Sequence, residues 1–340
     1  MKPTAGWVKG LLKYLVAVAL LAFVIAMNWT DLNVLFSRDP QPIYFAATLG
    51  LMVVVIGLQY LRWFLLVRAL DLPFTLGYGL RLGMVGTFYN MFLPGGIGGD
   101  FVKAYLIAKG QPARQAAAVS TVIADRLLGL FGLLLYVAVV GGLCWADGDA
   151  RIAASFWLKF IITACVALAT GFVVGYAFLN AVPAQFGERL RRYKVSLGEM
   201  WDAARRYRQR PTTILTCVAV SAVAHLGLVM SFHFAVLAFP PEDPALIATL
   251  PELFVIAPIG YITQALLPFP GGIGAAELTF KGLYILLRGE AGGPVGVAGR
   301  LTLRVAEWVI GFAAYIAYLR TKSEIPADAE VTAAEPAAVA

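Results

Sequence analysis

The sequence predicts an all-α integral membrane protein with about six full transmembrane helices and two re-entrant helical hairpins. Of its 340 residues, 60% are hydrophobic and only 14% are charged, which leaves too little polar surface for a soluble domain of this length. Apolar segments of about 17 to 25 residues, the length that crosses a bilayer, recur along the chain. A Pro-Gly-Gly motif interrupts this apolar pattern twice, at Pro94 and at Pro270.

The apolar segments define the transmembrane helices in chain order. The first follows Lys2, Lys9 and Lys13, as a secretion signal would, but no small-x-small cleavage pattern comes after it, so we expect a retained signal anchor. The full transmembrane helices are predicted near 11–29, 43–67, 119–145, 153–180, 212–238 and 295–319.

Two further apolar segments, 75–92 and 245–267, run directly into the motifs "LPGGIGGD" and "FPGGIGAAE". Proline stops a helix and glycine permits positive φ, and non-helical backbone at membrane depth requires cover from protein or water. We therefore expect re-entrant hairpins over 75–109 and 245–287 that share a polar cavity; the alternative is a tight loop between ordinary spans at a membrane surface. The backbone of this cavity is predicted to include Pro94, Gly95, Gly96, Gly98, Gly99, Pro270, Gly271, Gly272 and Gly274.

Charge distribution predicts the orientation. Within the basic loop 186–211, the stretch 188–211 holds eight Lys or Arg residues against three acids, and short cytoplasmic loops retain positive charge. We expect a multi-pass protein of the cytoplasmic (inner) membrane with both termini in the cytoplasm. The loop also interleaves arginines with aromatic residues, which favours an amphipathic segment on anionic lipid. Positive-inside retention explains the net charge of +7, so nucleic acid is not expected as a partner.

The predicted elements repeat with opposite orientation. Two spans, a hairpin and a span make a first half, 1–150, and the same order returns in a second half, 151–320; a disordered tail is expected over 321–340. In membrane carriers, inverted repeats of this kind place the substrate site at interrupted helices near the bilayer midplane.

Four segments together resemble a known family: "LPGGIGGDFVKAYLIAKG", "ADRLLGL", "LPFPGGIGAAELTF" and "LTLRVAEW". Over about 10–320 the chain resembles the transmembrane region of lysylphosphatidylglycerol synthases and the stand-alone flippase-like proteins that share it. The resemblance implies a lipid-translocating or lipid-linked membrane domain with two re-entrant hairpins. The soluble aminoacyl-transferase domain of the full synthases has no counterpart in this sequence, so aminoacyl transfer is not expected. Lys103 stands where the family often carries arginine, which keeps the charge but not the bidentate fork.

Charged residues inside apolar segments mark the candidate binding site, because each costs about 2.5–3.5 kcal/mol at the bilayer centre. Arg126 and Arg304 each follow a Pro-Gly-Gly motif by about 30 residues, and arginine presents a planar fork to phosphate. The alternative for Arg126 is a structural ion pair with Asp100 or Glu277. The predicted substrate-binding residues are Arg126, Arg304, Lys103, Lys281, Asp100, Glu277, Asp125, Arg81 and Arg300.

Spacing along the helices predicts some of the contacts of these residues. Asp100 and Lys103 are three apart, Glu277 and Lys281 four apart, and Arg304 and Glu307 three apart, so each pair can share a helix face. Asp125 must find its partner on another segment. Asp100 begins the returning half-helix, where capping is favoured over a substrate or proton role. Glu277 stands one residue further along its motif and is less well placed to cap.

The function we expect is that of a flippase or transporter for a phospholipid or a polyprenyl-phosphate-linked lipid. The alternatives are a non-catalytic lipid-binding partner of a synthesis complex and a membrane enzyme acting on lipid headgroups. The sequence offers no convincing nucleophile, general acid and base, or metal cluster, and no G-K-[ST] follows the glycines. We therefore expect no enzyme activity, no catalytic residue, no metal and no cofactor; the sequence identifies no protein partner. His225 and His233 are expected to be packed residues.

Overall fold

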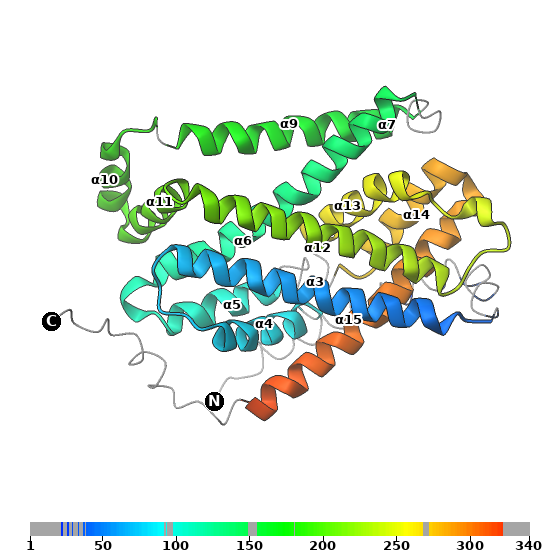
Figure 1. The fold of residues 1–340 in the computed structure, drawn as a ribbon, viewed down its shortest axis with the longest axis horizontal. Helices are drawn as coiled ribbons and strands as arrows, with labels where there is room; N and C mark the ends of the chain where they lie inside the picture. The colour runs from blue at the N-terminus through cyan, green and yellow to red at the C-terminus, as the bar shows by residue number, and fades with distance from the viewer. Residues whose placement is uncertain are drawn as a thin grey trace, which may run out of the picture.

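The computed structural model describes residues 39–91, 93, 98–148, 155–179, 181–267 and 272–321, together with five single residues before 39. Within these ranges the chain is helical and holds no strand (Figure 1). The helices are α3 (Pro42–Ala69), α4 (Leu76–Asn90), α5 (Gly98–Lys109), α6 (Gln115–Tyr136), α7 (Gly142–Ala146), α9 (Phe156–Phe178), α10 (Ala184–Tyr193), α11 (Val195–Arg208), α12 (Pro211–Leu237), α13 (Leu250–Leu266), α14 (Ala275–Arg288) and α15 (Gly293–Thr321).

Five helical segments are long and apolar enough to cross a membrane, and they agree with five of the six predicted spans. The first predicted span, 11–29, and the predicted tail lie outside the described residues, apart from a few single positions and Thr321. The five segments are Pro42–Ala69, Pro112–Ala146, Phe156–Phe178, Pro211–Leu237 and Glu290–Arg320.

The centre of the bundle is the pair α3 and α12, which lie side by side and run in opposite directions (Figure 1). Around this pair, α6 and α15 each pack against both central helices. One hydrophobic core is centred on Phe232 of α12, whose ring stacks on Phe280 of α14 at 4.4 Å. A second core surrounds Trp63 of α3, which is 1% exposed. The central pair thus contributes to both cores.

Four of the shorter helices form two contacting pairs. α4, α5, α13 and α14 have 15, 12, 17 and 14 residues, whereas a spanning helix needs about 20. α4 packs against α5 and α13 against α14; the first pair lies in the left half of Figure 1 and the second in the right half. These are the segments predicted as hairpins.

α4 and α5 cross with their backbones in close approach. A Cβ added to Gly99 would lie 1.9 Å from the carbonyl oxygen of Gly86, and the Gly99 N–H donates to Asn90 Oδ1 at 2.7 Å. Side chains at either glycine would hold the helices apart, so the absence of a Cβ permits this crossing.

The packing of each half has a counterpart in the other. α4 contacts α3, α5 and α15, and α13 contacts α12, α14 and α6. Likewise α5 packs on α6, and α14 packs on α15. The contacts of one half therefore become those of the other when α3, α4, α5 and α6 are exchanged with α12, α13, α14 and α15, respectively.

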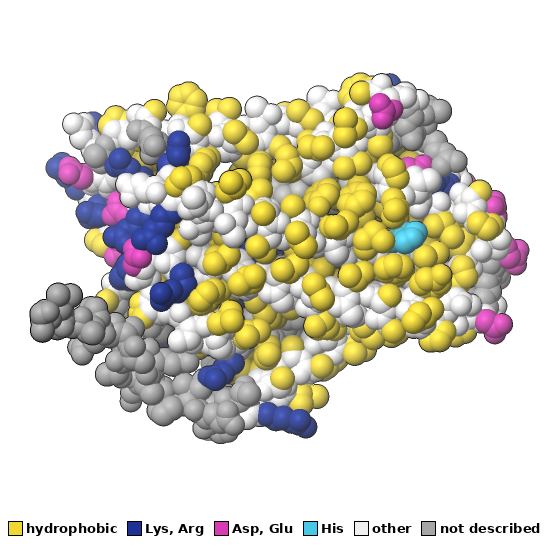
Figure 2. Space-filling view, viewed as in Figure 1, with side chains coloured by type: hydrophobic (Ala, Val, Ile, Leu, Met, Phe, Trp, Pro, Cys, Tyr) yellow, Lys and Arg dark blue, Asp and Glu magenta, His cyan; other side chains and the backbone are white. Residues whose placement is uncertain are grey.

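The two ends of the molecule differ in charge. Lys and Arg side chains gather at the end formed by α10 and α11, with some acidic side chains among them, whereas Asp and Glu predominate at the opposite end (Figure 2). The sequence predicted a loop over 186–211, but this region forms two short helices that pack against each other, with the rings of Phe186 and Trp201 in edge contact at 5.1 Å. The interleaved aromatic residues provide the apolar contact that holds the basic segment in helical form.

A π-helical turn over Val137–Gly141 joins α6 to α7. It packs against α9 and α13, and Val137 and Gly141 are buried there. The turn is continuous with the helices on both sides, so Pro112–Ala146 forms one membrane-length segment with a local change of helical register.

Replacing Gly99 with alanine should lower the midpoint of thermal unfolding of the purified protein in detergent. The new Cβ would collide with the backbone of Gly86, and overpacking of this kind costs about 1–3 kcal/mol. Gly57→Ala on α3 is the matched control, because a Cβ there meets no atom within 4 Å and should leave the midpoint unchanged or raised. Equal midpoints for the two variants would contradict the close crossing.

Candidate functional site

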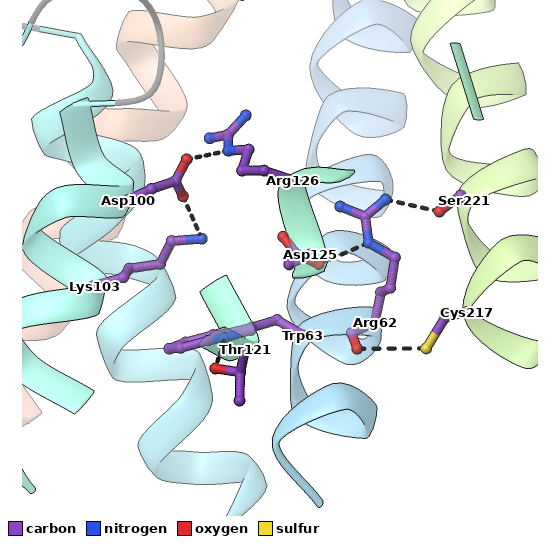
Figure 3. Close-up of polar contacts among 9 residues, drawn as sticks. All are labelled: Arg62, Trp63, Asp100, Lys103, Thr121, Asp125, Arg126, Cys217 and Ser221. Atoms are coloured by element: carbon purple, nitrogen blue, oxygen red, sulfur yellow. Dashed lines mark hydrogen bonds and ion pairs between the residues drawn. The ribbon is translucent and has the colours of Figure 1, made fainter. Parts of the chain in front are cut away.

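A buried carboxylate with two cationic partners lies where α5 meets α6. Asp100, in the first turn of α5, forms an ion pair with Lys103 Nζ at 2.7 Å and accepts a hydrogen bond from Arg126 Nε of α6 (Figure 3). The side chains of Asp100 and Lys103 are 8% and 11% exposed, whereas that of Arg126 is 42% exposed. The contact expected between Asp100 and Lys103 is present, and Arg126 is the accessible member of the group.

Lys103 is held from the side by an aromatic ring. Its Nζ lies 5.0 Å from the ring centroid of Trp63 on α3, a cation–π contact. The indole N–H of Trp63 donates to Thr121 Oγ1 at 3.1 Å, which ties the ring to α6. Gly86 leaves room for the lysine stem, since a Cβ there would lie 2.8 Å from Lys103 Cγ. Three helices therefore set the position of this ammonium group.

A second ion pair lies beside the first in Figure 3. Arg62 Nε of α3 donates to Asp125 Oδ1 at 2.7 Å, and its Nη1 donates to Ser221 Oγ of α12 at 2.8 Å. Asp125 thus has the partner on another segment that its position required. Arg62 was missed in the sequence analysis, although a lone arginine inside the apolar segment 43–67 meets the same criterion as the residues selected there.

The residues of Figure 3 carry an excess of positive charge. Among the described residues, the carboxylates that pair with Arg62, Lys103 and Arg126 are Asp100 and Asp125. A buried cation is unfavourable without a counter-ion, but the buried Arg62 and Lys103 each have a carboxylate partner, so an additional anion would pair with Arg126. The exposed side of Arg126 is where one has access.

The second half holds an equivalent ion pair. Glu277, in the first turn of α14, accepts from Arg304 Nε of α15 and from the N–H of Gly274 at 2.7 Å. The side chains of Arg304 and Glu277 are 2% and 0% exposed. Gly272 and Gly274 adopt φ of +65° and +82°, a backbone geometry that favours glycine, and the Gly272 carbonyl accepts from Arg304 Nη2 at 3.3 Å. This pair is closed off, in contrast to Asp100 and Arg126.

Arg300 lies one turn before Arg304 on α15. Its Nη2 donates to Glu307 Oε2 at 2.9 Å and to Gln264 Oε1 of α13 at 3.3 Å, and its side chain is fully buried. The three-residue spacing allowed Glu307 to pair with Arg304. In the structure, Glu307 pairs with Arg300 instead. The reason is that Arg304 turns toward Glu277 on the neighbouring helix.

Glu277 caps its helix, although the sequence placed it less well for this role than Asp100. Glu277 forms a capping box at the start of α14, because its longer side chain reaches back to the Gly274 N–H. The described side-chain partners of Asp100 are Lys103 and Arg126. The position of Glu277 relative to the glycines of its motif did not by itself reveal this capping role.

The remaining predicted positions are distributed as follows. Arg81 is half-buried on α4 and Lys281 is half-buried on α14; neither belongs to the ion pairs described above. Gly98 and Gly99 begin α5. Pro94, Gly95, Gly96, Pro270 and Gly271 lie outside the described residues.

Another buried pair escaped the sequence analysis. Arg288, at the end of α14, donates to both carboxylate oxygens of Glu252, at the start of α13, and their side chains are 4% and 1% exposed. Glu252 also accepts from the Thr249 N–H at 2.7 Å, which completes a capping box. This pair joins the outer ends of the two short helices, and its sequence signal was an acid three residues after threonine.

A cavity of about 520 Å³ lies beside Arg304. Its lining comes from α15, from the first turn of α3 and from the end of α12, and is apolar apart from Arg304, Thr302 and Gln41. Among the described residues, no three His, Cys, Asp or Glu side chains gather as a metal site would require. The polar chemistry of this region therefore rests on arginine, lysine and their carboxylate partners.

The comparison with known families decides what kind of protein this is. The model for the lysylphosphatidylglycerol synthase TM region matches residues 10–314. The chain belongs to this family. A UPF0104 membrane protein of Methanothermobacter thermautotrophicus is 24% identical over 301 residues, which cover 81% of this chain and 83% of that protein. No solved structure matches the chain. The assignment confirms the resemblance and makes this a membrane protein of the lysylphosphatidylglycerol synthase TM family.

Replacing Arg304 with methionine should destabilise this family member more than Arg126→Met. Breaking a buried pair costs about 3–5 kcal/mol because one charge is left unpaired, whereas Arg126 is 42% exposed and its pair is screened. The measurement is the midpoint of thermal unfolding in detergent.

The double variant Glu277→Gln, Arg304→Met is the control for this prediction. The introduced glutamine keeps an oxygen that can accept from the Gly274 N–H, and neither substituted side chain is charged, so part of the lost stability should return. A double variant as unstable as Arg304→Met alone would show that packing, not charge, dominates this position.

Proposed function

We propose that this protein binds the phosphate of an anionic lipid headgroup at Arg126 and moves the lipid between the leaflets of the membrane. The observation that carries the proposal is the surplus positive charge beside a half-exposed arginine. A phosphate has the charge that the cluster lacks, and its oxygens accept in parallel from a guanidinium fork. Lys103 adds a point charge behind the fork.

Binding would proceed by exchange of partners. Arg126 is held by Asp100, so an incoming phosphate competes with that carboxylate, and Lys103 at 2.7 Å keeps Asp100 compensated when Arg126 turns away. The headgroup stays inside the protein while the acyl or prenyl tails remain in the bilayer. No bond is made or broken, so the proposed activity is not enzymatic.

Movement between leaflets fits an inverted repeat with two re-entrant hairpins. Three features support it: the mirrored packing of α4 with α13 and of α5 with α14, four shorter helices in two contacting pairs, and equivalent ion pairs 26 and 27 residues apart in sequence. In carriers, such repeats exchange conformations around a midplane site. The open pair at Arg126 and the closed pair at Arg304 then correspond to one of two alternating states.

The family name adds support for a lipid. Lysylphosphatidylglycerol synthases are named for a phosphate-bearing lipid product, and the family model covers the TM region of those proteins. We extend the lipid chemistry to this chain, since its own surplus charge suits the same headgroup phosphate. The phospholipid or polyprenyl-phosphate-linked lipid it carries is to be identified by assay.

The test is lipid movement in liposomes that contain the purified protein. A fluorescent phosphatidylglycerol should become accessible to an impermeant quencher faster than in protein-free liposomes. Arg126→Gln should reduce this rate about tenfold, as removal of a charge-assisted contact does, while Arg126→Lys should retain part of it.

Arg191→Gln is the control, because Arg191 pairs with Asp202 on the surface helices, far along the chain from the cluster. Wild-type liposomes that move lipid no faster than empty ones would refute the transport proposal. If they nonetheless retain one anionic lipid through Arg126, the non-catalytic lipid-binding role takes its place.

We further propose that the basic end of the molecule faces the cytoplasm of the inner membrane, with both termini on that side, because α10 and α11 hold the densest group of arginines. Single cysteines would replace Ser196 on α11 and Asp147 and Glu290 at the opposite end, all exposed, in a chain lacking Cys144, Cys165 and Cys217.

On intact cells, a membrane-impermeant maleimide should label the cysteines introduced at positions 147 and 290 and spare the one at position 196. Labelling of position 196 alone would reverse the orientation. Labelling of position 147 without position 290 would contradict the hairpin arrangement of α13 and α14, because that arrangement places both positions on one side of the membrane.

A further inference from the structure

A large apolar groove lies between α6 and α9, away from the ion pairs. Its volume is about 870 Å³, within the range of cavities that hold whole small ligands. α11 and α12 complete its lining at the basic end of the molecule. Arg126 and Asp125, although on α6, are not among the lining residues.

The groove exists because α9 separates from the bundle along its length. Its buried residues, Leu158, Ile162, Cys165 and Ala169, all lie in the first part of the helix. Beyond them, Gly171 and Gly175 line the groove, and a Cβ added at either would meet no atom within 4 Å. The second part of α9 therefore faces α6 across open space, as the diverging helices of Figure 1 show.

The polar groups on the groove wall are satisfied by the protein with one exception. Ser120 Oγ donates to the Ala116 carbonyl at 2.8 Å, and Tyr207 Oη donates to the Leu66 carbonyl at 3.1 Å. Tyr176 Oη is buried and has no hydrogen-bond partner among the described residues. A buried hydroxyl without a partner is unfavourable, so a ligand acceptor is missing at this position.

A cation lies beside the same tyrosine. The guanidinium carbon of Arg208, at the end of α11, lies 4.9 Å from the centroid of the Tyr176 ring. Its Nε is also buried and has no described hydrogen-bond partner. Two donors, one of them charged, thus meet at the mouth of an apolar groove with no described acceptor between them.

We infer that the groove binds one acyl chain of an anionic glycerophospholipid, whose headgroup phosphate accepts from Tyr176 Oη and Arg208 Nε. The apolar wall suits the chain, and the two donors suit a phosphate oxygen. Bulk acyl chains cover any membrane-facing surface, but the mouth also offers donors and a cation, which favour a headgroup phosphate whose charge is not already balanced by an ammonium group in the same headgroup. This site goes beyond the proposed transport function, since it holds a lipid without moving it.

The experiment is photo-crosslinking of the full-length protein in lipid nanodiscs. The probes are phosphatidylglycerol and phosphatidylcholine that carry the same photoreactive acyl chain, and adducts are mapped by mass spectrometry. Phosphatidylglycerol should label the peptide over 167–179, which does not include Arg126, about tenfold more than phosphatidylcholine does.

The variants separate the chain from the headgroup. Gly171→Leu with Gly175→Leu fills the groove and should remove the adducts of both probes, whereas Gly50→Leu, on the lipid-facing side of α3 where a Cβ also meets no atom within 4 Å, should not. Arg208→Gln and Tyr176→Phe should abolish the preference for phosphatidylglycerol. If the leucine variant does not fold, these two polar variants still test the site.

Equal labelling of the wild type by both probes would overturn the inference, as would a phosphatidylglycerol preference that survives Arg208→Gln. Labelling of the leucine variant at the wild-type level would show that the acyl chain does not lie in the groove between α6 and α9. Arg126→Gln should leave the adducts unchanged, so failure of the transport proposal and failure of this one give different results.

Discussion

The ion pair between Glu277 and Arg304 shows the constraint on which the architecture depends: a charge in the membrane interior must meet its counter-charge inside the protein. The pair ties the start of α14 to the middle of α15, and Glu277 also holds the Gly274 N–H at the break before the helix. Asp100 and Arg126 make the same link from α5 to α6. In each half, the first turn of a short helix is therefore anchored to a long helix by an ion pair.

Both halves contain an ion pair between a short helix and a long helix, but the two pairs differ in how far their arginine is exposed. Arg304 is enclosed, beside an apolar cavity, and its charge is balanced locally by Glu277. Arg126 is half-exposed and shares Asp100 with Lys103. The first half thus presents an accessible cation, whereas the second half encloses its cation within the protein. The two halves therefore share the same helix contacts but differ in the burial and the balance of their charged residues.

Apolar length predicted the long helices well, because crossing the hydrocarbon sets a minimum that the sequence displays directly. Partners of the charged residues were harder to predict, since Arg62 meets Asp125 across 63 positions and no local spacing encodes that contact. The capping role of Glu277 depended on one extra methylene relative to aspartate, and on where α14 begins. The basic segment became two helices because Phe186 and Trp201 meet, a contact between its parts that charge counting does not represent.

The π turn at Val137–Gly141 interrupts the regular α-helical register of the segment that carries Arg126, so side chains before and after the turn are rotated relative to each other about the helix axis. A residue added to a helix rotates everything beyond it by about 100° relative to the uninterrupted spiral. Before the turn, α6 packs against α3, α5, α11 and α12 and also against α9 and α13, and the turn itself packs against α9 and α13. Unwinding that one turn would therefore rotate the part of the segment that carries Asp125 and Arg126 relative to the part beyond the turn, without sliding the segment through the membrane.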